Sequence, residues 1–219
     1  MAQMAKRVFR LQYASGLHLE MYNHVHFPSL VNPAAPYLAL AGNVGNCNSA
    51  HMQRFFKYVN KRWEKVFYVL GTKEHGAAKM IKKELLPYTN ITLLDEYNRS
   101  FYFPKDNLAI IGSSRAAQVN VENYVKFWAY QKTKIVMLTH HAPLSNLQTI
   151  TPQIKAWVHG YEDTKEQVNT FVNECGFPLE DTSNPEAVLE IEIDTDEDTG
   201  ASDSELISAA TGIGFIYLR

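Results

Sequence analysis

The stretch APYLALAGNVGN (35–46) decides the fold class of this chain. Residues 35–42 are almost wholly apolar, which is typical of a short strand buried on both faces of a parallel sheet. The GNVGN segment (42–46) follows at once and is built from glycine and asparagine, which favour a polar loop. A buried strand that runs directly into such a loop is the pattern expected of an α/β fold.

The same pattern recurs along the chain. Further strands are predicted at 7–14, 65–71, 90–97, 134–143 and 155–163, with a hairpin in 101–113 that turns at 104–107. An amphipathic helix is predicted at 49–63, a second helix begins at 76 and should end near Pro87, and a third is predicted at 118–132. The C-terminal part predicts antiparallel strands at 167–175, 187–194 and 212–219. Strands that alternate with helices predict a single α/β domain over residues 1–219.

The composition is that of an ordinary globular protein, with 46% hydrophobic and 20% charged residues among 219. No apolar run reaches the roughly 18 residues that a membrane span needs. The N-terminal segment lacks the apolar block and cleavage site of a signal peptide. Cys47 and Cys175 give neither a disulfide framework nor a paired metal-ligand spacing. We therefore expect an intracellular, cytoplasmic, soluble protein with no membrane partner.

The charge is uneven, although the net charge is only -2. Residues 186–205 carry nine acidic and no basic side chains, and the rest of the chain has 21 basic against 14 acidic residues. Such a weakly basic body predicts no nucleic-acid partner. We expect a solvated, mobile acidic loop near 194–210. Calcium binding there stays open, because some side chains have the spacing of an EF-hand loop: Asp194, Asp196, Asp198, Ser202 and Glu205.

Five predicted strands end in polar residues that could form one site. These ends read SGLH (15–18), GNVGN (42–46), GTKEHG (71–76), THHAP (139–143) and HGYED (159–163). In α/β folds the loops at the carboxyl ends of the strands converge, and ligands bind there.

In order and spacing, these five segments resemble the motifs of the calcineurin-like metallophosphoesterase family, and the similarity extends from residue 7 to about residue 180. The small single-domain members are the most similar, including the phrases HHAP and WVHG. The resemblance implies a four-layer sandwich, in which two mixed β-sheets are flanked by helices. It also implies two metal ions at the strand ends and hydrolysis of phosphate esters.

The resemblance places the following residues at metal-site positions: Gly16, His18, Asn43, Thr72, His140, Tyr161 and Asp163. Of the family's metal ligands, only His18 and His140 are retained. The first aspartate is replaced by Gly16 and the bridging aspartate by Asn43. Lys73 stands at the position of the histidine that protonates the leaving group. The resemblance thus implies a scaffold that keeps its turns and loses its metal chemistry.

Electrostatics oppose a two-metal site, because two dications need anionic ligands and Lys73 adds a further positive charge. In the favoured interpretation Asp163 pairs with Lys73, and the histidines are hydrogen-bonded loop residues. Alternatively His18, Asn43 and Asp163 hold one Zn²⁺ or Mn²⁺ ion. A further alternative is that Lys73, His18 and His140 bind phosphate or another anion without metal.

We therefore expect a catalytically inactive pseudo-phosphoesterase with no resident cofactor. Its role would be binding, structural support or assembly with protein partners. The sequence also leaves open whether the chain forms a homo-oligomer. One alternative is a phosphoester hydrolase with a single metal or an atypical site. Another is an interaction protein that acts through the acidic residues 186–205 or through an exposed face, within a larger assembly.

Overall fold

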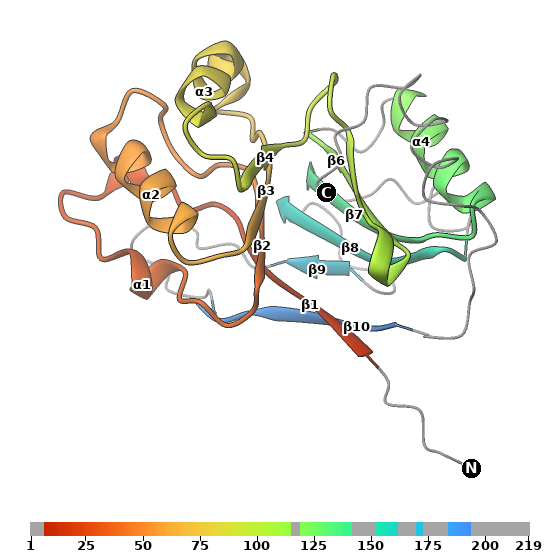
Figure 1. Cartoon of the computed structure of the whole chain (residues 1–219). Helices are drawn as coiled ribbons and strands as arrows, with labels where there is room; N and C mark the ends of the chain where they lie inside the picture. The colour runs from red at the N-terminus through yellow and green to blue at the C-terminus, as the bar shows by residue number, and fades with distance from the viewer. Residues whose placement is uncertain (1–6, 115–118, 142–151, 162–169, 173–183, 194–219) are drawn as a thin grey trace.

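Two five-stranded sheets lie face to face in the computed structural model of the chain (Figure 1). The structure describes residues 7–114, 119–141, 152–161, 170–172 and 184–193. The first sheet has the strand order β10-β1-β2-β3-β4 and the second has the order β5-β6-β7-β8-β9. Each sheet is mixed, because one edge pair is antiparallel and the remaining pairs are parallel.

The strands of the first sheet are β1 (Arg7–Ala14), β2 (Tyr37–Ala41), β3 (Lys65–Val69), β4 (Ile91–Leu93) and β10 (Val188–Ile193). Those of the second are β5 (Ser100–Phe103), β6 (Leu108–Ser113), β7 (Lys134–His141), β8 (Ile154–Tyr161) and β9 (Thr170–Val172). Because β1, β2 and β3 are parallel to one another, and so are β6, β7 and β8, each sheet gathers its carboxyl ends at one edge.

Helices cover the outer faces of both sheets (Figure 1). The first sheet packs against α1 (Phe27–Leu30), α2 (Ala50–Asn60) and α3 (Ala78–Leu85), and the second against α4 (Val119–Tyr130). Short 3-10 turns complete the set: η1 (Leu19–Met21), η2 (His75–Ala77) and η3 (Pro104–Asp106). The alternation of side chains along β2 builds two cores. Leu38 and Leu40 face the helices, while Ala39 and Ala41 face the second sheet.

Local sequence accounts for α2. The Ser49 hydroxyl accepts a hydrogen bond from the backbone N–H of Met52 at 3.2 Å and so caps the helix N-terminus. The predicted apolar stripe is fully buried against the first sheet, including Met52, Phe55 and Val59. The helix predicted at 49–63 is therefore confirmed, although it ends three residues earlier, at Asn60.

The α/β class and the hairpin turned at 104–107 are confirmed, since β5 and β6 pair in antiparallel fashion around η3. The antiparallel direction predicted for 167–175 is wrong, because β9 runs parallel to β8. The three residues of β9 do not themselves indicate whether the strand pairs in parallel or antiparallel fashion. That direction depends on the connection between β8 and β9. The strand predicted at 187–194 is confirmed as β10, which is antiparallel to β1 and alternates buried and exposed side chains.

Some expectations concern residues outside the described part of the chain. These are the acidic loop near 194–210, the last strand at 212–219 and Cys175. Cys47 is described and is buried as a free thiol. Among the described helices, none combines the length and the apolar character required to cross a membrane.

Candidate functional site

The carboxyl ends of β1, β2 and β8 are joined by hydrogen bonds. The backbone N–H of Gly16 donates to the carbonyl of Gly42 at 3.0 Å, and that of His18 donates to the carbonyl of Asn43 at 3.0 Å. The Ser15 hydroxyl donates to the carbonyl of Gly160 at 3.2 Å. The structure therefore brings together strand ends that lie far apart in the sequence, as the sequence predicted.

Gly42 allows the closest approach between these loops. Its φ of +85° is in the left-handed region, which favours glycine. A β-carbon at this position would lie 2.6 Å from His140 Nδ1 and 2.7 Å from the Cα of Gly71. The absence of a side chain at Gly42 thus lets the ends of β2, β3 and β7 meet at one point.

Glu74 holds two of the loops together. Its side chain is 1% exposed, and its carboxylate accepts from four backbone N–H groups. Oε1 accepts from Val44 at 2.5 Å and from Gly45 at 3.1 Å, while Oε2 accepts from Asn43 at 2.9 Å and from Gly71. Burial raises the pKa of Glu74 above its ordinary value, and the N–H groups of Gly71, Gly45 and Asn43 oppose that rise.

His140 is 1% exposed and bonded through both ring nitrogens. Its Nδ1 lies 2.9 Å from the carbonyl oxygen of Ala41, which can only accept, so Nδ1 carries the proton. Its Nε2 lies 3.1 Å from the Thr72 hydroxyl. Burial lowers the pKa of His140, so the neutral ring is favoured and its Nε2 lone pair accepts from Thr72.

Lys73 extends its ammonium group between His18 and Glu20. The Lys73 Nζ atom lies 3.3 Å from His18 Nδ1 and 3.3 Å from Glu20 Oε1. Burial and then the Lys73 charge lower the pKa of His18, whereas Glu20 opposes this shift. Burial by itself would raise the pKa of Glu20, but hydrogen bonds from its own backbone N–H and from Lys73 bring the net shift below the ordinary value.

Five of the predicted site residues lie at these converging strand ends: Gly16, His18, Asn43, Thr72 and His140. Lys73 lies with them. Tyr161 is the last residue of β8, and Asp163 lies outside the described residues. The predicted pairing of Lys73 with Asp163 therefore stays a prediction, while the structure shows an ion pair of Lys73 with Glu20.

The side chains described at this point do not fit a pair of metal ions. No group of three or more His, Cys, Asp or Glu side chains comes together as a metal site within the described residues. His18, which the resemblance makes a ligand, has the Lys73 ammonium 3.3 Å from its Nδ1. A cationic donor beside a ligand nitrogen competes with a metal ion for the same lone pair.

Two residues of the site, Glu74 and Glu20, were missed from the sequence. Glu74 had a detectable signal, because it follows the strand-end glycine Gly71 by three residues and its side chain can reach back to the N–H groups of that turn. Glu20 had none, since its approach to Lys73 depends on how the β1 and β3 loops fold together. The contact of Lys73 with Glu20 was therefore not expected, while the predicted pairing with Asp163 stays a prediction.

Comparison with known proteins supports the fold class. No protein-family model matches the chain. An uncharacterized protein of Acanthamoeba polyphaga mimivirus is 32% identical over an alignment 124 residues long, and the match covers 48% of this chain and 43% of that protein. The chain thus spans less than half the length of that relative. A solved crystal structure is similar with a TM-score of 0.50 and 12% identity, over 86% of this chain and 95% of that one. This likeness concerns the α/β fold alone.

Proposed function

We propose that this chain is a degenerate protein of the calcineurin-like metallophosphoesterase type, with the four-layer sandwich of that family. In it, the Lys73 ammonium takes the place of metal chemistry, and the protein serves in binding or assembly rather than in hydrolysis. The observation that carries this proposal is the position of Lys73 Nζ, 3.3 Å from both His18 Nδ1 and Glu20 Oε1. That ammonium supplies positive charge at the convergence of the loops.

Charge supports the proposal. Like charges repel, so the Lys73 ammonium would oppose a dication bound beside it, with the repulsion reduced by solvent because the Lys73 side chain is 49% exposed. The neutral Gly16 and Asn43 stand where the resemblance implies aspartates, and they supply no compensating charge. The carboxylate of Glu20 is already engaged by Lys73.

The close packing of the strand-end loops explains why the fold would be stable without metal-dependent chemistry. Gly42 and Gly71 still permit close contact between the loops, and Glu74 still ties the β2 and β3 ends together. These features stabilise the strand ends whether or not a metal is bound. A binding role needs such an ordered surface, while hydrolysis would also need an activated water.

Two restored variants test the proposal. Both carry Gly16→Asp, Asn43→Asp, Tyr161→His and Asp163→His, and one of them also carries Lys73→His. We measure bound Mn²⁺ and hydrolysis of p-nitrophenyl phosphate. We expect metal binding and activity only in the variant that lacks Lys73. Stoichiometric metal and efficient turnover in the native chain would refute the proposal, and equal metal binding by both variants would refute the role of Lys73.

A second candidate is a phosphoester hydrolase with an atypical, metal-free site. The observation that favours it is the Thr72 hydroxyl, which lies 3.1 Å from His140 Nε2, while Ala41 orients the ring through Nδ1. A hydroxyl beside an oriented neutral imidazole has the arrangement of an activated nucleophile. Hydrolysis of p-nitrophenyl phosphate in EDTA that is abolished by Thr72→Val would support this candidate. Equal background rates for Thr72→Val and the native chain would exclude it.

A protein partner for the acidic residues 186–205 is also part of the proposal, because nine acidic side chains without a basic one form a strongly charged segment. Pull-down with the whole chain and with a variant that lacks 194–210 tests it. Loss of the bound proteins on deletion is the expected result, and unchanged recovery would place any partner elsewhere. Sedimentation of the whole chain at several concentrations tests for a homo-oligomer.

A further inference from the structure

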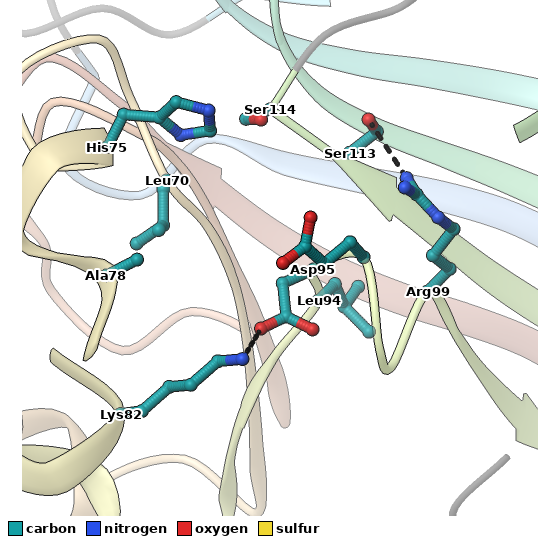
Figure 2. Close-up of a pocket in the computed structure, with 10 residues that line it drawn as sticks. Leu70, His75, Ala78, Lys82, Leu94, Asp95, Arg99, Ser113 and Ser114 are labelled. Carbon is teal, nitrogen blue, oxygen red and sulfur yellow. Dashed lines mark hydrogen bonds and ion pairs between the residues drawn. The ribbon is translucent and has the colours of Figure 1, made fainter. Parts of the chain in front are cut away.

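A hollow of about 190 Å³, lined by both polar and apolar side chains, lies beside the converging strand ends, and its apolar lining is Leu70, Ala78 and Leu94 (Figure 2). It is lined from five elements or their ends: the carboxyl end of β3, η2, α3, the segment between β4 and β5, and the carboxyl end of β6. Its polar side chains are His75, Lys82, Asp95, Glu96, Arg99, Ser113 and Ser114. Only His75 belongs to one of the five predicted segments, and none was predicted as a site residue.

Hydrogen-bond donors converge on this hollow. Arg99 is 4% exposed, and its Nη1 atom lies 3.5 Å from the hydroxyl of Ser113, which is 1% exposed. Figure 2 shows the Arg99 and Ser113 side chains directed toward each other, with His75 and Ser114 across the upper part of the hollow. A guanidinium group, two hydroxyls and an imidazole therefore border one small volume.

The acidic side chain of Asp95 is already engaged. Its Oδ2 atom lies 2.5 Å from Lys82 Nζ, and its Oδ1 atom accepts from the backbone N–H groups of Tyr97 at 2.9 Å and Asn98 at 3.1 Å. The Lys82–Asp95 pair thus adds little net charge to the wall. Glu96 also lines the hollow and is exposed to solvent.

A second hollow of about 140 Å³ continues the first. Both are lined by His75 and Ser114, and the second also reaches Thr72, His140 and His141. The two hollows are therefore neighbours, and together they lead from Arg99 toward the ends of β3 and β7. A ligand with one anionic end and a short organic part would occupy both.

We propose that Arg99, Ser113, Ser114 and His75 bind the phosphate group of a small organic phosphate, and that its organic part extends toward Thr72 and His140. A carboxylate has two oxygens in one plane, which a single guanidinium can satisfy. Donors on several walls of the hollow suit the three terminal oxygens of a phosphate better. This proposal goes beyond the loss of metal chemistry and does not depend on it, because neither Lys73 nor His18 lines either hollow among the described residues.

Calorimetric titration with glycerol 3-phosphate in EDTA tests the site, with lactate as the carboxylate comparison. We expect saturable binding of glycerol 3-phosphate, and a loss of affinity of about tenfold or more in Arg99→Gln and in Ser114→Asp. Thermal melts check that the variants fold. If Arg99→Gln does not fold, Ser114→Asp decides, because Ser114 is only partly buried and the added carboxylate would repel phosphate.

Two controls complete the test. Arg54→Gln removes an exposed guanidinium on α2 and should leave the affinity unchanged. A loss of affinity in Lys73→Gln as large as that in Arg99→Gln would place the anion at Lys73 and overturn the proposal. Absence of saturable binding, normal binding by Ser114→Asp, or lactate binding as tight as glycerol 3-phosphate would each overturn it as well.

Discussion

Replacing Glu74 by glutamine should loosen the strand ends more than any surface substitution. Each carboxylate oxygen of Glu74 accepts from two backbone N–H groups: Oε1 from Val44 and Gly45, and Oε2 from Asn43 and Gly71. Whichever oxygen becomes the amide nitrogen, two N–H groups lose their acceptor and face another donor.

The expected loss of stability follows from the number of backbone N–H groups that lose their acceptor. A buried donor left without an acceptor costs about 1–3 kcal/mol, so two cost about 2–6 kcal/mol. A domain is stable by about 5–15 kcal/mol, so the loss is a large share of the free energy of unfolding. Equilibrium urea unfolding of Glu74→Gln measures it directly.

Glu190→Gln is the matched control, because it makes the same chemical change at a side chain that is 60% exposed. Glu190 pairs with Arg10 at 3.0 Å on the surface, and such pairs contribute at most about 1 kcal/mol. If Glu74→Gln lost no more stability than Glu190→Gln, the role given to Glu74 in holding the loops together would be wrong.

Other substitutions test the same strand ends. Gly71→Ala should destabilise the fold by about 1–3 kcal/mol or more in urea unfolding, because its β-carbon would collide with the backbone of the Asn43 loop. Gly76→Ala should cause no loss, since its β-carbon meets nothing within 4 Å, and equal effects at both glycines would contradict the packing. Burial lowers the pKa of His140 below its ordinary 6.5, so the unfolded chain binds more protons as the pH falls. The neutral His140 ring therefore contributes fully to stability above pH 6.5, and this contribution is lost as the pH falls from 6.5 through the lowered pKa of the folded state. His140→Asn should make stability less dependent on pH between 7 and 5, and an unchanged pH dependence would contradict the lowered pKa. Ser49→Ala should cost about 1 kcal/mol in thermal unfolding because α2 loses its cap, and an unchanged melting temperature would show that the cap is dispensable.

The sequence predicts the strands and helices well where the local pattern is strong. Residues 35–42 are continuously apolar, and β2 is buried between the two cores as this pattern predicts. The stripe of α2 likewise has the period of a helix, and its buried face matches it. The direction of β9 was not predictable, because parallel or antiparallel pairing depends on a connection and not on the three strand residues.

The site was predictable in outline only. The convergence of the loops follows from parallel strands, so His18, Asn43, Thr72 and His140 were correctly expected together. The ion pair of Lys73 with Glu20 was not expected, because the β1 loop brings Glu20 to Lys73 through contacts that no local pattern encodes.

The hollow beside Arg99 was missed for a similar reason. The residues that line it come from separate segments of the chain, and no single segment has a pattern typical of a binding site. The cavity forms only when these segments pack together in the fold. No motif in the sequence marks Arg99 or Ser113 as a pair.

The proposed replacement of metal chemistry by Lys73 is tested most directly by metal analysis. The purified native chain is equilibrated with Mn²⁺ or Zn²⁺, freed of unbound ions, and measured by mass spectrometry for metal per chain, alongside hydrolysis of p-nitrophenyl phosphate. We predict well under one ion per chain and no metal-dependent turnover. One or two tightly bound ions per chain, together with turnover that EDTA abolishes, would contradict this prediction.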